Sequence, residues 1–125
     1  MTTVEITKDN LDATVTENDI VLLDFWAEWC GPCRQFGPVF EQASVDNPDL
    51  VFGKVDTEAQ PELQAAFNVM SIPTLMIFRE QVLVFSQPGA LPAAVLTNLI
   101  EQVRALDMAA VHAEIAEREA APARR

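Results

Sequence analysis

The chain has 125 residues, the size of one domain, and half of them are hydrophobic, a balance typical of folded rather than disordered proteins. Asp and Glu number 19 against 8 Lys and Arg, which gives a formal net charge of -11. This negative field opposes polyanions, so nucleic acids and anionic membrane surfaces are poor candidate partners. The longest apolar runs, such as residues 20–23, have four residues and are far too short to cross a bilayer.

The first residues are polar and interrupted by charges, and they lack the basic and apolar segments of a secretory signal. We therefore expect a cytoplasmic protein. The only cysteines are Cys30 and Cys33. A secreted disulfide scaffold normally carries four or more, and a disulfide that closes so short a loop stabilises little. The pair therefore indicates redox chemistry.

The first elements alternate strand and helix. Val4 and Ile6 predict a short edge strand, and Thr7 is expected to cap a helix that ends near residue 16. Residues 20–26 are nearly all apolar, which is typical of a strand covered on both faces in a parallel sheet. Asp24 is the one charged residue in that strand.

A helix is expected over residues 31–45. Cys33, Phe36, Phe40 and Ala43 recur at helical spacing and share one face. This places Cys33 on the inward side and Cys30 at the exposed tip of the helix. Pro38 should kink the helix in its middle.

The remaining elements are a strand over 50–55, a short helix over 61–67, a hairpin of strands 74–78 and 82–85, and a helix from about 92 to 106. Right-handed crossovers make the first three strands parallel. The predicted fold is α/β, a central mixed five-stranded sheet of three parallel strands and an antiparallel hairpin, flanked by four helices. We expect one domain over residues 1–106 and an Ala/Glu-rich helical extension over 107–125 that frays at its end.

The segment Trp29-Cys30-Gly31-Pro32-Cys33 lies between a predicted strand and a helix, the setting expected of a redox motif. A thiolate attacks a disulfide, and the unpaired N–H groups at a helix N-terminus favour negative charge on the first cysteine. Pro32 costs the helix little so near its start and stiffens the loop between the sulfurs.

At these residues the sequence resembles the thioredoxins, over about residues 3 to 106. The resemblance depends on WAEWCGPC at 26–33 and on its order with the other matching positions, which are Asp24, Pro38, Lys54, SIPT at 71–74, Gly89 and Ala90. It implies the thioredoxin fold and a protein-disulfide reductase. Cys30 then matches the nucleophile that forms a mixed disulfide with the client, and Cys33 the thiol that resolves it.

The resemblance also assigns a role to Asp24, the aspartate in the apolar strand. Asp24 matches the residue that helps to move the proton of the resolving cysteine, with Lys54 tuning it. A carboxylate in a buried strand should have a raised pKa because desolvation disfavours its charge. The alternative is a structural carboxylate paired with Lys54 on the neighbouring strand.

The resemblance places a client-binding platform around Cys30. The bond before Pro73 is expected to be cis, and the backbone of Ile72 to pair with an extended client segment. Platform residues would be Trp29, Gly31, Pro32, Ile72, Pro73, Gly89 and Ala90. An exposed apolar patch of this kind is typical of a protein-binding site. Trp26 is expected to pack in the core instead.

Three features depart from the family pattern. Met70 and Ser71 precede Ile72 where a basic residue and glycine are usual, which could favour less acidic clients. Glu80 and Gln81 replace a glycine turn in the hairpin, so that turn geometry is expected to differ. The segment beyond residue 106 exceeds the usual length and is either a passive helical cap or a docking segment.

The leading hypothesis is a cytoplasmic, monomeric reductase of client disulfides that is recharged by a flavin-dependent thioredoxin reductase drawing on NADPH. The chain itself has no dinucleotide fingerprint, so neither FAD nor NADPH should bind to it. A metal site is not expected, because His112 is the one histidine and is distant from the cysteines in the predicted fold.

Two other functions stay open. A disulfide oxidant or isomerase is disfavoured by Gly31-Pro32, since oxidising relatives usually have histidine there. A binding module or chaperone would use the apolar platform without redox turnover, and would keep its activity when both cysteines are changed to serine.

Overall fold

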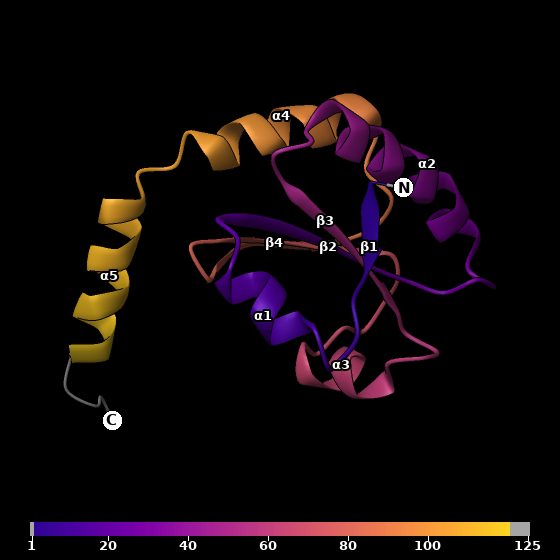
Figure 1. Cartoon of the computed structure of the whole chain (residues 1–125), viewed down its shortest axis with the longest axis horizontal. Coiled ribbons are helices and arrows are strands. Elements are labelled where there is room, and N and C mark those ends of the chain that lie inside the picture. The colour runs from indigo at the N-terminus through magenta and orange to yellow at the C-terminus, as the bar shows by residue number, and fades with distance from the viewer. Residues whose placement is uncertain (1, 121–125) are drawn as a thin grey trace.

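The computed structural model describes residues 2–120 and contains five strands and five helices (Figure 1). The strands are Thr3–Glu5 (β1), Ile20–Trp26 (β2), Val51–Asp56 (β3), Thr74–Arg79 (β4) and Val82–Pro88 (β5). The helices are Leu11–Thr16 (α1), Gly31–Asp46 (α2), Pro61–Ala66 (α3), Ala93–Arg104 (α4) and Met108–Ala120 (α5).

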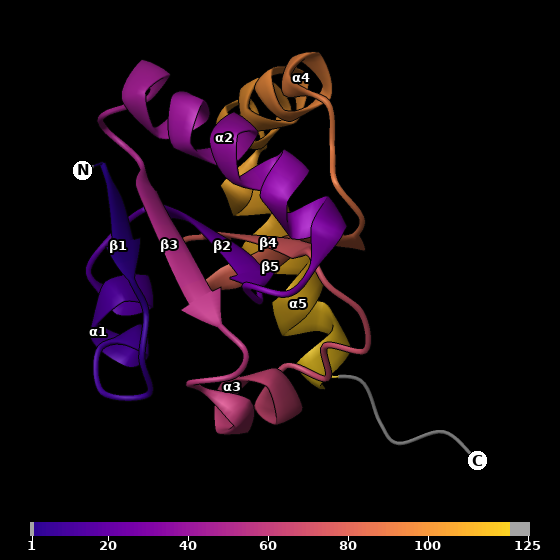
Figure 2. The same ribbon diagram turned by 90° about the vertical axis from the view of Figure 1, so that its right-hand side faces the viewer.

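All five strands form one sheet in the order β1-β3-β2-β4-β5. β1, β3 and β2 are parallel, and β4 and β5 are antiparallel to their neighbours. Helices α2 and α4 cover one face, while α1 and α3 lie on the other (Figure 2). The predicted fold class is therefore confirmed.

The sheet separates two apolar clusters. One contains Phe36 and Phe40 of α2 with Leu96 and Ile100 of α4. The other lies under α1 and α3 and includes Phe25 of β2. β2 is buried along almost its whole length because both clusters contact it, which is why its sequence is nearly continuously apolar. The site residues that β2 carries to its carboxyl end are thus held by a rigid central strand.

The first helix begins later than the sequence predicts. Thr7 is not its N-cap, since α1 starts at Leu11. Thr7 Oγ1 accepts a hydrogen bond from the Asp9 N–H, and Asn10 Oδ1 accepts one from the Thr7 N–H. These two bonds stabilise a turn that precedes the helix, so the helix itself begins about one turn later than expected.

The hairpin of β4 and β5 turns without a glycine. Its loop has two residues, and both Glu80 (φ 51°) and Gln81 (φ 69°) adopt positive φ. Positive φ at both loop residues is the type I′ arrangement that glycine-containing hairpins favour. Glu80 and Gln81 thus adopt this turn without a glycine, in a backbone region that non-glycine residues seldom occupy, and the expected difference from the family's turn stays a prediction.

α5 lies beside the β4–β5 hairpin (Figures 1 and 2). His112 Nε2 is 2.8 Å from Glu80 Oε1 in the hairpin loop, and Met108 is buried. Arg79 of β4 donates to the carbonyls of Val103, Arg104 and Leu106, so the α4–α5 junction is tied to the sheet. The expected fraying towards residue 125 concerns residues 121–125, which lie outside the described part of the chain.

Candidate active site

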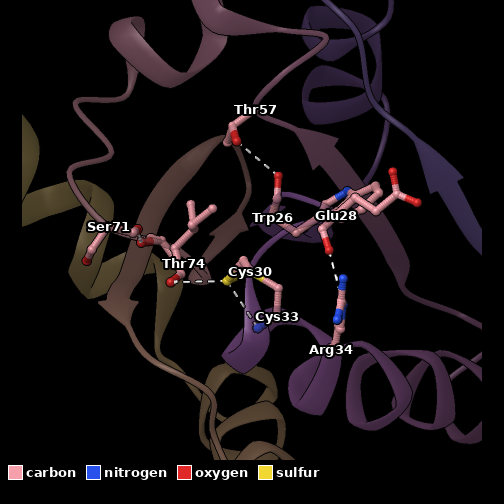
Figure 3. The surroundings of a disulfide bond; sticks show 9 residues. Trp26, Glu28, Cys30, Cys33, Arg34, Thr57, Ser71 and Thr74 are labelled. Carbon is pink, nitrogen blue, oxygen red and sulfur yellow. Dashed lines mark hydrogen bonds between the residues drawn. A yellow bond between two sulfur atoms is a disulfide. The ribbon is translucent and has the colours of Figure 1, made fainter.

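A disulfide joins Cys30 and Cys33 at the N-terminus of α2, just beyond the end of β2 (Figure 3). Cys30 is the N-cap residue of α2, and its Sγ accepts a hydrogen bond from the Cys33 N–H at 3.2 Å. Pro32 occupies the first turn, where a missing N–H costs the helix nothing. The N–H of Cys33, one of the N–H groups without a partner within the helix, therefore donates to the sulfur that would carry negative charge in the reduced protein.

Cys30 is not exposed, contrary to the sequence-based expectation. Its exposed fraction is 4%, against 6% for Cys33. Helical periodicity places Cys30 at a helix tip, but it cannot show the loop before β4, which covers it. Cys30 packs in a small apolar cluster with Ala27, and Ile72 and Trp26 contact this cluster.

The loop before β4 supplies the wall opposite the disulfide. The Ile72–Pro73 bond is cis, as expected, and the carbonyl oxygen of Ile72 lies 3.6 Å from Cys30 Sγ. Thr74 Oγ1 donates to the Ser71 carbonyl at 2.6 Å, and the Gly89 N–H donates to the Pro73 carbonyl at 2.8 Å. These bonds hold the loop at a fixed distance from the sulfur.

A hollow of about 420 Å³ opens beside Cys30. It contains four expected platform residues, Trp29, Gly31, Pro32 and Ile72. Trp29 is 66% exposed, as expected for a surface position. Pro73 is buried behind the rim, and the described lining of the hollow does not include Gly89 or Ala90. The hollow is therefore built by the start of α2 and the loop before β4.

Asp24 lies in the middle of β2 directly opposite Lys54 of β3. Its exposed fraction is 1%, and its Oδ1 has no hydrogen-bond partner within the described chain. Burial raises the pKa of Asp24 from its ordinary value of 3.8 to about 7, although the charge of Lys54 lowers it. A carboxyl with this pKa can hold or release a proton near neutrality.

A second hollow, of about 280 Å³, lies on the other side of the disulfide and is lined by Cys33, Lys54 and Trp26. The Lys54 Nζ lies 4.9 Å from the centre of the Trp26 ring, a cation–π distance. Trp26 is half-buried, and its indole N–H has no partner in the described structure. Cys30 thus faces one hollow, and Cys33 shares the other with the lysine next to Asp24.

Comparison with known proteins identifies this arrangement. The thioredoxin family model matches residues 2–102. The chain belongs to the thioredoxin family. A Streptomyces coelicolor protein classed as a thioredoxin is 69% identical over 118 residues, which cover 94% of this chain and 88% of that protein. Thioredoxin C-3 of Corynebacterium nephridii is 44% identical over 79% of this chain and 69% of its own length.

Solved thioredoxins share the fold. A single-site mutant of a thioredoxin from Halobacterium salinarum superposes with a TM-score of 0.73 at 33% identity, over 79% of this chain and 88% of that one. Plasmodium falciparum thioredoxin gives a TM-score of 0.73 at 33% identity, over 79% and 97%. The family and the disulfide-bonded Cys30–Cys33 pair make this thioredoxin a thiol–disulfide oxidoreductase.

Sequence reasoning missed part of the hollow beside Cys30. Thr57, Glu58 and Gln64 line it, together with Met70 and Ser71, which the sequence singled out only as departures from the pattern. Thr57 and Glu58 directly follow β3, which is parallel to β2. The carboxyl ends of parallel strands lie at one edge of a sheet. The position of Thr57 and Glu58 directly after β3 could therefore have predicted that they lie near Cys30.

Among the described residues, no group of three or more His, Cys, Asp or Glu side chains could hold a metal ion. His112 lies in α5 and bonds to Glu80, away from the disulfide. Within residues 2–120, no helix combines the length and apolar character needed to cross a membrane.

Proposed function

We propose that this thioredoxin reduces disulfides of client proteins, with Cys30 as the nucleophile and Cys33 as the resolving thiol. The observation that carries the proposal is the position of Cys30. Cys30 is the N-cap of α2, and its Sγ accepts a hydrogen bond from the Cys33 N–H. It also borders the larger of the two hollows beside the disulfide, where a client can reach it. Cys33 borders the other hollow instead.

The exchange proceeds in two balanced steps. The Cys30 thiolate attacks one sulfur of the client disulfide, forms a mixed disulfide and releases the first client thiolate. The Cys33 thiol then loses its proton and attacks Cys30 Sγ, which forms the internal disulfide and releases the second client thiolate. The client gains two electrons, and the cysteine pair loses two.

Asp24 is proposed to accept the proton that Cys33 loses. Its pKa of about 7 matches this task, because a base is most effective when its pKa lies near the working pH. Lys54 is the charged neighbour of Asp24 and lines the same hollow as Cys33. That hollow is large enough to admit water, which can carry a proton between polar groups.

The client is proposed to lie along the hollow beside Cys30. An extended client segment would pair with the backbone of Ile72, next to the cis-Pro73, and would contact Trp29, Gly31 and Pro32. Gly89 supports this wall through its bond to the Pro73 carbonyl, and Ala90 follows it. The exposed Trp29 supplies the apolar contact.

Recharging of the pair is proposed to come from a flavin-dependent thioredoxin reductase that draws its electrons from NADPH. The protein would thus act as an electron carrier in cell redox homeostasis, as a cytoplasmic monomer. Both the reductase and disulfide-containing clients are partners that membership of the family suggests.

The reduction potential of the Cys30–Cys33 pair tests the direction of this chemistry. The dithiol and disulfide forms are equilibrated against a reference dithiol, and free thiols are trapped and counted by mass. Thioredoxins have potentials of about −270 mV and strong oxidants of the same fold about −120 mV. A value of about −260 to −290 mV supports the reductase and makes NADPH-coupled turnover the next assay, whereas one above about −200 mV favours an oxidant or isomerase. A pair that does not cycle favours a binding module.

Residues 1–106 are proposed as the catalytic domain and residues 107–125 as a helical cap. The family model stops at residue 102, but the S. coelicolor relative aligns over 94% of the chain, which includes most of this extension. Met108 is buried, and Val111 and Ile115 line a hollow with residues 82–84 of β5.

A chain that ends at Leu106 is therefore expected to lose stability and keep its activity. Loss of the buried Met108 side chain alone should cost about 2 kcal/mol, which is several degrees in Tm. Thermal unfolding and insulin reduction are measured on the truncated and full chains, and on a full-length Met108→Ala variant that removes this contact alone. A large loss of activity at unchanged stability would instead make the extension a docking segment.

A further inference from the structure

The rim of the hollow beside Cys30 carries an unusually exposed methionine. Met70 is 85% exposed, more than any other large hydrophobic side chain in the described chain, and Trp29, which lines the same hollow, is 66% exposed. Water contact of two large apolar groups is unfavourable in the isolated protein. Grouped around a reactive sulfur, they mark a surface for an apolar partner group.

The backbone that carries Met70 is fixed on both sides. Before it, α3 ends in a Schellman motif: Asn68 has φ 54° and donates to the Ala65 carbonyl, while the Val69 N–H donates to the Gln64 carbonyl. This motif buries Val69 and turns Met70 outward. After it, Thr74 holds the Ser71 carbonyl. The apolar rim is therefore preorganised, which reduces the entropy lost when a client binds.

The same hollow has a negative charge on one side. Among the residues that line it, all within the described chain, Glu58 alone is charged, and it is an exposed residue. The Glu58 N–H donates to Asp56 Oδ1 at 2.9 Å, which fixes the turn and adds a second carboxylate nearby. The net charge of the whole chain is -11. A cationic client side chain is therefore attracted to this position, and an anionic one is repelled.

Four of the six Lys and Arg residues within residues 2–120 pair with carboxylates elsewhere: Lys8 with Glu62, Arg79 with Asp19, Arg104 with Asp49 and Arg118 with Glu114. The other two, Arg34 and Lys54, line the hollow of Cys33. No cation among the described residues therefore lines the hollow beside Cys30.

We propose that Met70 and Glu58 make this thioredoxin selective for client disulfides flanked by an apolar residue and a basic residue. The selectivity rests on the proposed reductase function. The apolar client side chain packs between Met70 and Trp29, and the Lys or Arg of the client lies towards Glu58 while the client sulfur meets Cys30. Met suits this contact, because its flexible thioether adapts to differently shaped apolar partners.

The test uses the full chain, reduced with dithiothreitol and desalted, so that no reductase is required. Three disulfide peptides share one sequence, with an apolar residue on one side of the cysteine, and differ only in the residue on its other side, which is Lys, Gln or Glu. Oxidation of the protein by each peptide is followed as a second-order rate constant. Neutral hydroxyethyl disulfide serves as a reference substrate that carries no side chain for the rim.

The reduced protein is expected to react with the Lys peptide about fivefold faster than with the Glu peptide at low salt, and the ratio should shrink as salt is added. E58Q should bring the ratio close to one, and E58K should invert it. In M70S, rates with peptides that carry an apolar flanking residue should fall several-fold relative to hydroxyethyl disulfide. The control E119Q removes the same charge from the far end of α5 and should retain the wild-type ratio.

Equal rates with all three peptides, or a ratio that E58Q leaves intact, overturn the inference without touching the proposed function. A ratio that E119Q lowers as much as E58Q assigns the effect to overall charge and also overturns it. Failure of the proposed function looks different, because the reduced protein would then react with neither the peptides nor hydroxyethyl disulfide.

Discussion

Cys33→Ser is expected to leave the protein covalently joined to its client. The reduced variant still attacks a client disulfide through Cys30, but it lacks the thiol that releases the product. Turnover should fall on the order of a thousandfold or more, because an external thiol at millimolar concentration replaces one held in place. Non-reducing electrophoresis and mass spectrometry should show a one-to-one adduct that dithiothreitol dissolves.

The expectation follows from the placement of the two cysteines rather than from their exposure. Both are almost fully buried, so accessibility does not separate their roles. Cys30 borders the hollow of Trp29 and Met70, whereas Cys33 borders the hollow of Lys54. The Cα atoms of the pair are 5.2 Å apart, so Cys33 stays within reach of a mixed disulfide on Cys30.

Cys30→Ser is the matched control, since it has the same composition and keeps one thiol in the pair. It should form no adduct and show no turnover, because its remaining thiol faces away from the client. An adduct that forms on Cys33 alone but not on Cys30 alone would reverse the two roles. Full turnover by Cys33→Ser would remove the resolving step from the mechanism.

The fold could be predicted largely from two patterns. The continuous apolar run of residues 20–26 indicates a central strand, and it is buried by clusters on both faces. The spacing of Cys33, Phe36 and Phe40 gives the inward face of α2, and all three are buried. Such patterns depend on neighbours a few residues apart, which a sequence displays directly.

The site was less predictable, because it is made where distant segments meet. The burial of Cys30 depends on Ile72, which lies 42 residues further along the chain. Glu58 and Gln64 belong to the hollow only because β3 and α3 end at the same edge as β2. No local periodicity contains that information, whereas the topology of the sheet does.

Asp24→Asn is expected to stabilise the protein above neutral pH. The folded-state pKa of Asp24 is raised to about 7 by burial, from 3.8. Its contribution to stability is fully present below pH 3.8 and is lost as the pH rises through 7, because the unfolded chain ionises this carboxyl first. The total loss is about 4 kcal/mol, of which about 3 kcal/mol falls between pH 5 and pH 8.

Urea unfolding of the oxidised protein at pH 5 and pH 8 measures this pH-dependent contribution of Asp24 to the unfolding free energy. The difference in unfolding free energy between Asp24→Asn and wild type should grow by about 3 kcal/mol over that interval. Asp9→Asn, which removes an exposed carboxylate, serves as the control and should leave the pH dependence unchanged. A parallel pH dependence in wild type and Asp24→Asn would mean that Asp24 ionises as it does in the unfolded chain.

The same variant should resolve mixed disulfides more slowly, by about tenfold or more, because asparagine accepts no proton. Rapid-quench measurement of adduct decay across pH 6 to 9 follows this step, and the wild-type rate should depend on a group that titrates near 7. A merely structural carboxylate paired with Lys54 would alter stability and leave adduct decay unchanged at every pH. Asp24 as proton acceptor requires both effects together: a more stable protein that releases its client more slowly. A buried carboxylate with a raised pKa beside a redox-active disulfide is the physical signature of a proton-transfer group, and these two measurements test it at Asp24.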